Sequence, residues 1–446
     1  MASNPIVNMF KVKEIRERLF FTFLILAVFR LGSVLTVPGI DANVLLKYFD
    51  DLAAQNKNSF ASYMDFFVGG AFSNFSILML GVMPYISMQI IMQLAVIIFP
   101  SLKRISQEDG GQRKIASYIR IGTIFVCIVQ ALGMTVFADQ IPNCQLISNR
   151  YLFKTLFILT VTTGSMITIW FGDQITARGI GNGISVMIFA GIVARFPSAL
   201  SGLYQKVSAG NGDPSLIAVV IVFIALLALI VLVIFEESGQ RKIPVHYAKR
   251  VVGRKMYGGQ STYIPFKINP SSVIPLIFAD ALLGLPLTLI QTFSKGAEAK
   301  PWLVKLSNIL LPDGIWYTVL KIILIIFFAY FYTQVTLNPT EIAKNIRENG
   351  GSIPGVRTDK TEEYLTKILN RLILPGSLFL ALIAVVPTIL ISFAGFPSEI
   401  ARLMGGTSLI ILVGVDLDTM SQVEALLKMH HHEGLTKKGK IRSRSL

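Results

Sequence analysis

Few side chains in this sequence have the types and spacing that chemistry requires. Of the four histidines, His430, His431 and His432 adjoin one another. Imidazole is a common metal ligand, but this run follows the last apolar segment, where no element fixes its geometry. The run GIGNG at 179–183 lies between two apolar segments, whereas a dinucleotide-binding loop follows a strand. The sequence therefore predicts no catalytic residue, no cofactor and no metal site.

A carboxylate inside an apolar segment is the remaining candidate for chemistry. Asp280 lies well inside the segment 272–293, and a buried carboxylate in a membrane is costly unless it faces a cavity or has a partner. Arg30 and Lys321 lie nearer the ends of their segments, where long side chains can reach water. A polytopic solute or proton transporter that uses Asp280 is therefore one function to weigh.

The composition indicates a membrane protein. Hydrophobic residues make up 53% of the chain and charged residues 15%, with a mean hydropathy of +0.62, far from a soluble domain. An apolar run of about 20 residues can cross the bilayer as a helix. We therefore predict an all-α polytopic membrane protein. The ten segments of sufficient length are 19–37, 76–99, 121–138, 155–172, 184–202, 216–235, 272–293, 315–335, 373–394 and 406–425.

Basic residues set the predicted orientation. If the N-terminus is cytoplasmic, most of the 41 lysines and arginines fall on the cytoplasmic side, which is the usual bias of membrane proteins. Both termini are therefore predicted to be cytoplasmic. The formal net charge of +15 also favours contacts with anionic lipids, an acidic protein or nucleic acid.

The ten segments divide into two sets of five. We predict an N-terminal half at 19–202 and a C-terminal half at 203–425, with a cytoplasmic segment at 1–18 before them and a basic cytoplasmic tail at 426–446 after them. An odd number of spans gives the halves opposite topology. That arrangement is an inverted repeat, whose functional site lies at the interface of the halves near the midplane.

One uncharged run is too long for a single span. Residues 66–100 contain no charge, and a helix of that length would extend well beyond the about 30 Å of bilayer hydrocarbon. Small and polar residues gather in its first third, so we predict a short piece that does not span, followed by a helix from about Ser76. Irregular backbone at membrane depth is tolerated only where protein covers it or it lines a wet cavity. The run therefore predicts a cavity.

Two cytoplasmic loops are longer than ordinary connections, which usually indicates function. In the loop 236–271, β-prone residues flank a basic middle and predict a projecting hairpin. In the loop 336–372, we predict a short helix from Pro339 to Glu348 and then a Pro-Gly turn that presents Arg357.

Six stretches of the sequence have a recognisable pattern. They begin at 69, 172, 237, 260, 338 and 405 and read GGAFSNFSILMLGVMPYISMQIIMQL, GDQITARGIGNGISVMIFAGIV, ESGQRKIPVHYAKR, QSTYIPFKIN, NPTEIAKNIRENGGSIPGVR and GGTSLIILVGVDLDTMSQVEALL. They closely resemble the SecY family of channel subunits of the protein translocon, in order over essentially the whole chain. The resemblance implies two pseudo-symmetric inverted halves of five spans around an hourglass pore with a plug and a lateral gate.

The resemblance implies a function and roles for particular residues. It implies passive conduction of unfolded secretory polypeptides across the bacterial inner membrane, with signal sequences and membrane spans released laterally into lipid. A hydrophobic ring would seal around the passing chain, and a plug, Asp65–Phe75, would close the outer funnel. Spans 2, 3, 7 and 8 would form the lateral gate, although an acidic residue at Asp280 is not expected there.

The resemblance assigns these roles by position. The ring residues are Val82, Ile86, Ile188, Ile192, Ile277 and Ile411. The plug residues are Asp65, Phe66, Phe67, Val68, Gly69, Gly70, Ala71, Phe72, Ser73, Asn74 and Phe75. The gate residues are Ser87, Pro275 and Asp280.

The resemblance also implies partners. SecE and SecG are the small membrane subunits of the family's heterotrimer, and the motor ATPase SecA and the translating ribosome dock on the cytoplasmic loops. A basic face can pair with rRNA phosphates or with acidic protein groups, although a single lysine there can equally be a solvated topogenic charge. The candidate docking residues are Arg241, Lys242, Lys249, Arg250, Arg254, Lys255 and Arg357.

Overall fold

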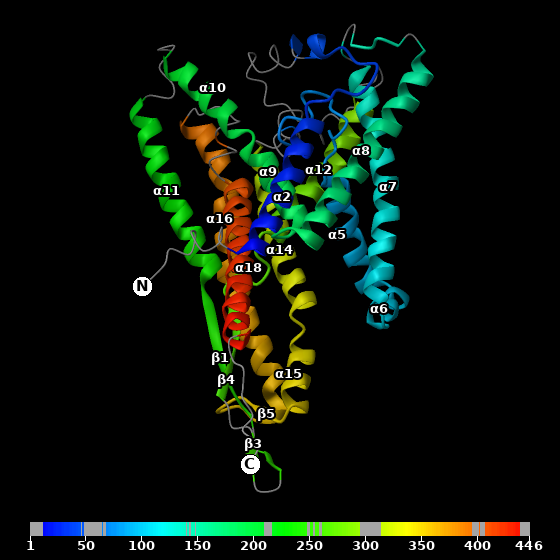
Figure 1. Cartoon of the computed structure of the whole chain (residues 1–446). Helices are drawn as coiled ribbons and strands as arrows, with labels where there is room; N and C mark the ends of the chain where they lie inside the picture. Colours follow the sequence, from blue (N-terminus) through cyan, green and yellow to red (C-terminus); the bar gives the residue numbers. More distant parts are fainter. Residues whose placement is uncertain are drawn as a thin grey trace. The chain divides into compact units, whose positions relative to one another are not determined.

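The described residues of this computed structural model (Figure 1) pack as two compact units. Unit 1 comprises residues 1–198 and 411–446, and unit 2 comprises residues 199–410. The structure describes residues 12–45, 47–48, 65, 68–139, 141, 144–147, 149–208, 216–247, 250–252, 255–257, 261–294, 314–394, 401 and 406–437.

Unit 1 consists of helices whose starts are marked by their sequences. The Asn149 side chain accepts a hydrogen bond from the Tyr151 N–H, and the Asn182 side chain accepts one from the Ile184 N–H, as N-cap residues do. Proline occupies the first turn of α5 and of α6, where its missing N–H costs nothing. The helices are α2 (Lys13–Gly32), α5 (Met83–Ile98), α6 (Pro100–Gln107), α7 (Gly111–Ala138), α8 (Arg150–Arg178) and α9 (Gly183–Val193), with α10 (Phe196–Ser208) and α18 (Thr407–Lys437) crossing the boundary between the units.

Unit 2 combines long helices with short strands. The apolar helix α11 exposes many large side chains, Phe223 and Phe235 among them, as a lipid-facing span does. The helices are α11 (Leu216–Ser238), α12 (Ile274–Ser294), α14 (Ile315–Thr336), α15 (Pro339–Glu348) and α16 (Thr361–Ala394).

Each of the ten predicted apolar segments falls largely on helix. Six of the described helices are long and apolar enough to cross a membrane, or seven if α5 and α6, which meet at 103°, count as one bent span. The apolar part of α12 is shorter, at Ile274–Gly284. The predicted class, an all-α polytopic membrane protein, is confirmed.

The predicted start of the second span was wrong. We expected a helix from about Ser76, but α5 begins at Met83. The residues between them form turns that hydrogen-bond to another segment, with the Ile77 N–H donating to the Leu35 carbonyl at 2.9 Å. Tertiary hydrogen bonds therefore replace the first two helical turns that the apolar pattern favoured.

The predicted span 184–202 lies within Gly183–Gly202, which is long and apolar enough to cross a membrane, but its helix is interrupted once. It divides into α9, which ends at Val193, and α10, which begins at Phe196. Pro197 explains the division, because it has no N–H to donate to the carbonyl of the preceding turn. The break places Arg195 between the two helices.

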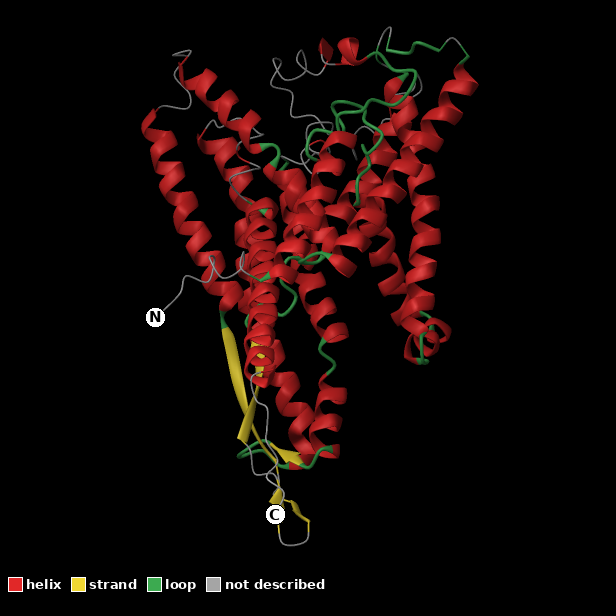
Figure 2. Cartoon of the chain, in the orientation of Figure 1, coloured by secondary structure: helices red, strands yellow, loops and turns green. Residues whose placement is uncertain are grey.

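The two long loops fold together, as Figure 2 shows for the strands. Strand β1 (Gln240–Tyr247) pairs antiparallel with β4 (Ser261–Lys267), and β5 (Gly351–Ser352) pairs with the end of β1. A second antiparallel pair, β2 (Arg250–Val252) and β3 (Lys255–Tyr257), continues the hairpin. Both the projecting hairpin and the helix from Pro339 to Glu348 are confirmed.

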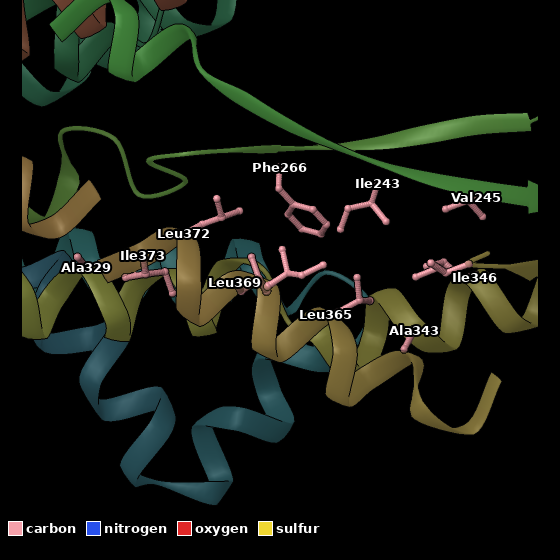
Figure 3. Packing of buried hydrophobic residues seen from close by; sticks show 12 residues of the cluster. Ile243, Val245, Phe266, Ala329, Ala343, Ile346, Leu365, Leu369, Leu372 and Ile373 are labelled. Atoms are coloured by element: carbon pink, nitrogen blue, oxygen red, sulfur yellow. The ribbon is translucent and has the colours of Figure 1, made fainter. Parts of the chain in front are cut away.

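A hydrophobic cluster joins these strands to the helices of unit 2 (Figure 3). Strand β1 contributes Ile243 and Val245, and β4 contributes Phe266. They pack on one side of α15 and α16, where Ile346 and Leu369 are buried. Lys242 and His246 alternate with the buried Ile243 and Val245 and are exposed, which places them on the opposite face of β1.

Candidate functional site

Residues 65 and 68–82 belong to a compact element of unit 1, called here the turn segment, in which residues 69–82 form turns and not a regular helix. Its hydrogen bonds are mostly internal. The Asp65 carboxylate accepts from the Ser73 N–H at 2.7 Å, and the Asp65 carbonyl accepts from the Gly70 N–H at 3.1 Å. The Ser76 N–H donates to the Ala71 carbonyl at 2.9 Å. Of the predicted plug, Phe66 and Phe67 lie outside the described residues.

Glycine lets the turn segment lie directly on the backbone of α9. Gly69 has φ +67°, and a β-carbon there would lie 2.6 Å from the Gly191 carbonyl oxygen and 2.7 Å from its Cα. No side chain fits such a gap, and the backbone angle itself favours glycine. The same helix carries the predicted ring residues Ile188 and Ile192, both buried. The turn segment and these ring residues therefore share one supporting helix.

Aromatic packing holds the turn segment at Phe75. Phe75 is fully buried, although its φ of +41° is unusual for a residue with a side chain. Its ring centroid lies 5.9 Å from that of Phe72, 6.0 Å from that of Phe137 on α7 and 6.1 Å from that of Phe157 on α8. Such backbone strain persists only where the surrounding structure fixes it, and these rings do so.

Two arginines hold the N-terminal end of the turn segment, at Asp65 and Gly69. Arg195 forms an ion pair with Asp65, whose side chain is only 8% exposed. Arg30 of α2 donates to the Gly69 carbonyl at 2.8 Å. Removing one partner of a buried pair leaves an uncompensated charge at a cost of about 3–5 kcal/mol. Sequence reasoning gave neither arginine this role, although an arginine within an apolar segment was a usable signal.

Five of the six predicted ring residues are buried and one is half-buried, and the six are divided between the two units. Val82 precedes α5 and its carbonyl accepts the Ile86 N–H at 3.2 Å. Unit 1 contains these two residues together with Ile188 and Ile192 on α9 and Ile411 on α18. The half-buried Ile277 belongs to α12 of unit 2. A ring formed by all six remains a prediction.

The predicted gate residues are also divided between the units. Ser87 of α5 is buried, and its hydroxyl donates to the Met83 carbonyl at 3.0 Å. Pro275 and Asp280 are buried in α12 of unit 2. The Asp280 carboxylate lies 2.6 Å from the Lys321 ammonium of α14. The expectation that Lys321 reaches water was therefore wrong, because it pairs within the protein instead.

The described docking candidates are exposed. Arg241 and Lys242 are both exposed residues of β1, and the Lys242 ammonium lies 4.7 Å from the Tyr263 ring centroid. Arg357 is 82% exposed beside Asp359. Strands β2 and β3 contain Arg250 and Lys255, whose side chains lie outside the described residues, as do Lys249 and Arg254 entirely. The side chains of His430, His431 and His432 on α18 are likewise outside the described part.

Comparison with known proteins decides the family. The SecY family model matches residues 76–420. This chain belongs to the SecY family. It is 43% identical over 423 residues to protein translocase subunit SecY of Borreliella burgdorferi, covering 95% of both chains. It is 39% identical over 433 residues to that of Escherichia coli K12, covering 96% of this chain and 95% of the relative.

Solved structures share the SecY fold with this chain. One, described as a protein conducting channel, matches with a TM-score of 0.62 at 20% identity. Sec61 in the canine ribosome-channel complex matches with a TM-score of 0.59 at 19% identity. Each comparison covers 95% of this chain and 97% of the other. The ten-helix architecture predicted from the sequence is that of this fold.

The close approach at Gly69 generates a prediction about stability. Gly69→Ala places a methyl group against the backbone of Gly191 in a strained conformation, which costs about 1–3 kcal/mol, so we expect a lower melting temperature for the purified protein in detergent. Gly202→Ala is the control, because Gly202 lies in α10 with nothing within 4 Å of its added β-carbon. Equal melting temperatures for the two variants would contradict the described packing.

Proposed function

We propose that this chain is the channel-forming subunit of a protein translocase, a passive gated pore that conducts unfolded polypeptides across the membrane. The observation that carries the proposal is similarity over 95% of the chain to a protein translocase subunit. The turn segment supports it, because irregular backbone at membrane depth is tolerated only where protein covers it or where it lines a water-filled cavity. The energy for transport then comes from partners and not from this chain.

Residues 65–75 of the turn segment are the proposed plug. One structure of the same fold is described as showing that the plug domain of SecY stabilises the closed state and maintains a membrane seal. In this chain the Asp65–Arg195 ion pair and the Arg30 hydrogen bond to Gly69 attach that segment to α9 and α2. Opening would then require these contacts to break together, so the closed state is favoured until a polypeptide enters.

The proposed constriction consists of aliphatic side chains. Branched apolar residues exclude hydrated ions by dewetting and deform around side chains of any type. That property suits a substrate whose common feature is being unfolded. The six predicted ring residues, all valine or isoleucine, are the proposed constriction.

A lateral exit for signal sequences and membrane spans is proposed between the spans that carry Ser87, Pro275 and Asp280.

The rival function, a proton or solute transporter that uses Asp280, has less support. Its carboxylate lies against a lysine ammonium, and the family members compared here are translocase subunits.

The proposed setting is the bacterial inner membrane with both termini in the cytoplasm. SecE and SecG would complete a heterotrimer, and anionic lipids would meet the basic cytoplasmic face. SecA and the ribosome are proposed to dock on β1, β4 and the turn at Arg357. Two structures of this fold are ribosome complexes, one of canine Sec61 and one of yeast Ssh1, which supports a ribosome contact.

The plug attachment predicts an ion leak when it is broken. Asp65→Asn leaves the Arg195 charge without its partner, so we expect ion conductance of proteoliposomes without substrate to rise about tenfold or more. Glu108→Gln is the control, because it removes one charge from an exposed pair with Lys114. The exchange Asp65→Arg with Arg195→Asp should lower the leak again. Unchanged conductance in Asp65→Asn would contradict the proposed plug.

The exposed turn at Arg357 predicts a docking defect. Arg357→Glu reverses the charge without touching a buried contact, so we expect SecA- and ATP-driven preprotein translocation to fall about tenfold while basal ion conductance stays unchanged. Lys344→Glu on α15 is the control, since Lys344 is 71% exposed in the same region. Full translocation in Arg357→Glu would exclude this turn as the docking site.

A further inference from the structure

Unit 2 contains an ion pair between two apolar helices. The Asp280 carboxylate of α12 and the Lys321 ammonium of α14 lie 2.6 Å apart, with side chains 1% and 11% exposed. α14 is long and apolar enough to span a membrane, and Asp280 lies within the apolar part of α12. Neither side chain serves the constriction or the plug described above.

The pair opposes separation of the two helices. Charges inside a membrane protein are tolerated when they pair with one another. Moving α12 away from α14 would leave a carboxylate and an ammonium in apolar surroundings, each without its compensating charge. Leaving one charge of a buried pair without compensation is strongly destabilising. The two helices therefore have a specific reason to stay together.

A second contact holds the same two helices at another level. The Phe278 ring of α12 meets the Phe328 and Tyr332 rings of α14 edge to face, with centroids 5.7 and 6.2 Å away. Residues 321 and 328 are about 10 Å apart along α14. Contacts at two levels restrain tilt as well as separation.

We propose that Asp280 and Lys321 are positioning residues that make α12 and α14 one moving body when the channel opens sideways. This inference rests on the proposed function, because it concerns how the lateral exit opens. It gives Asp280 a role that the family resemblance left open.

A covalent tie between the helices tests the proposal directly. Phe278→Cys and Phe328→Cys are introduced into a chain in which the free Cys127 and Cys144 are replaced by alanine and serine, and a short bis-maleimide joins them by adding one introduced thiol at each of its ends. We expect the joined protein to release a membrane span into the lipid of proteoliposomes as fast as the same protein before joining. A block of lateral release by the tie would overturn the proposal.

Charge variants test whether the ion pair itself is responsible. In the double variant Asp280→Asn with Lys321→Met no charge is left unpaired, so it is expected to fold, yet its lateral release of spans should fall about tenfold relative to secretion across the membrane. The exchange Asp280→Lys with Lys321→Asp should restore the ratio. An unchanged ratio of lateral release to secretion in the double variant would overturn the proposal.

Failure of the proposed function and failure of the inference about the ion pair give different results. If the unaltered chain with SecE, SecG, SecA and ATP secretes no preprotein, the proposed function fails and this inference fails with it. If the unaltered chain secretes normally and the double variant also releases spans normally, only the role of the ion pair is wrong. Melting temperatures of the variants show whether a lower ratio reflects misfolding, since misfolding would lower secretion and release alike.

Discussion

Backbone that leaves regular structure inside an apolar protein must find hydrogen-bond partners, and this constraint governs the turn segment. A non-helical stretch at membrane depth has no water to satisfy its N–H and C=O groups. Here those groups bond to the Asp65 side chain, to one another, to Arg30 and to the backbone that follows α2. A small set of polar contacts therefore supports an irregular element among apolar helices.

The same constraint explains why cations occur within apolar segments. Arg30 satisfies a carbonyl, Arg195 neutralises Asp65, and Lys321 neutralises Asp280. Each pairing joins an element to a neighbour that is distant in the sequence. Two of them attach the turn segment to its surroundings in unit 1, whereas the third joins two helices of unit 2. In the proposed channel, the first two restrain the part that moves and the third keeps two helices together as they move.

Patterns that are local in the sequence predicted local structure well. The projecting hairpin and the helix at Pro339–Glu348 follow from turn residues, caps and alternation, and both are present. Apolar runs located the helices for the same reason. The family resemblance supplied the function and the candidate plug, ring and gate, which composition alone did not indicate.

Features that depend on tertiary partners were missed. The start of α5 at Met83 is set by hydrogen bonds to residues near Leu35, and no pattern within residues 76–82 announces them. The pairing of Lys321 with Asp280 joins residues 41 positions apart, so the lysine looked free to reach water. The break between α9 and α10 is different, because it had a local signal in Pro197, which was missed because most of the residues around it are apolar.

Crosslinking from a stalled secretory chain tests the central claim, passage through the proposed constriction, most directly. A single cysteine in the stalled polypeptide is paired in turn with Ile86→Cys, with Ile277→Cys and with Val231→Cys on the exposed face of α11, in a chain without Cys127 and Cys144. We predict disulfide adducts at positions 86 and 277 and none at 231. Absence of both adducts, with secretion otherwise intact, would contradict the account.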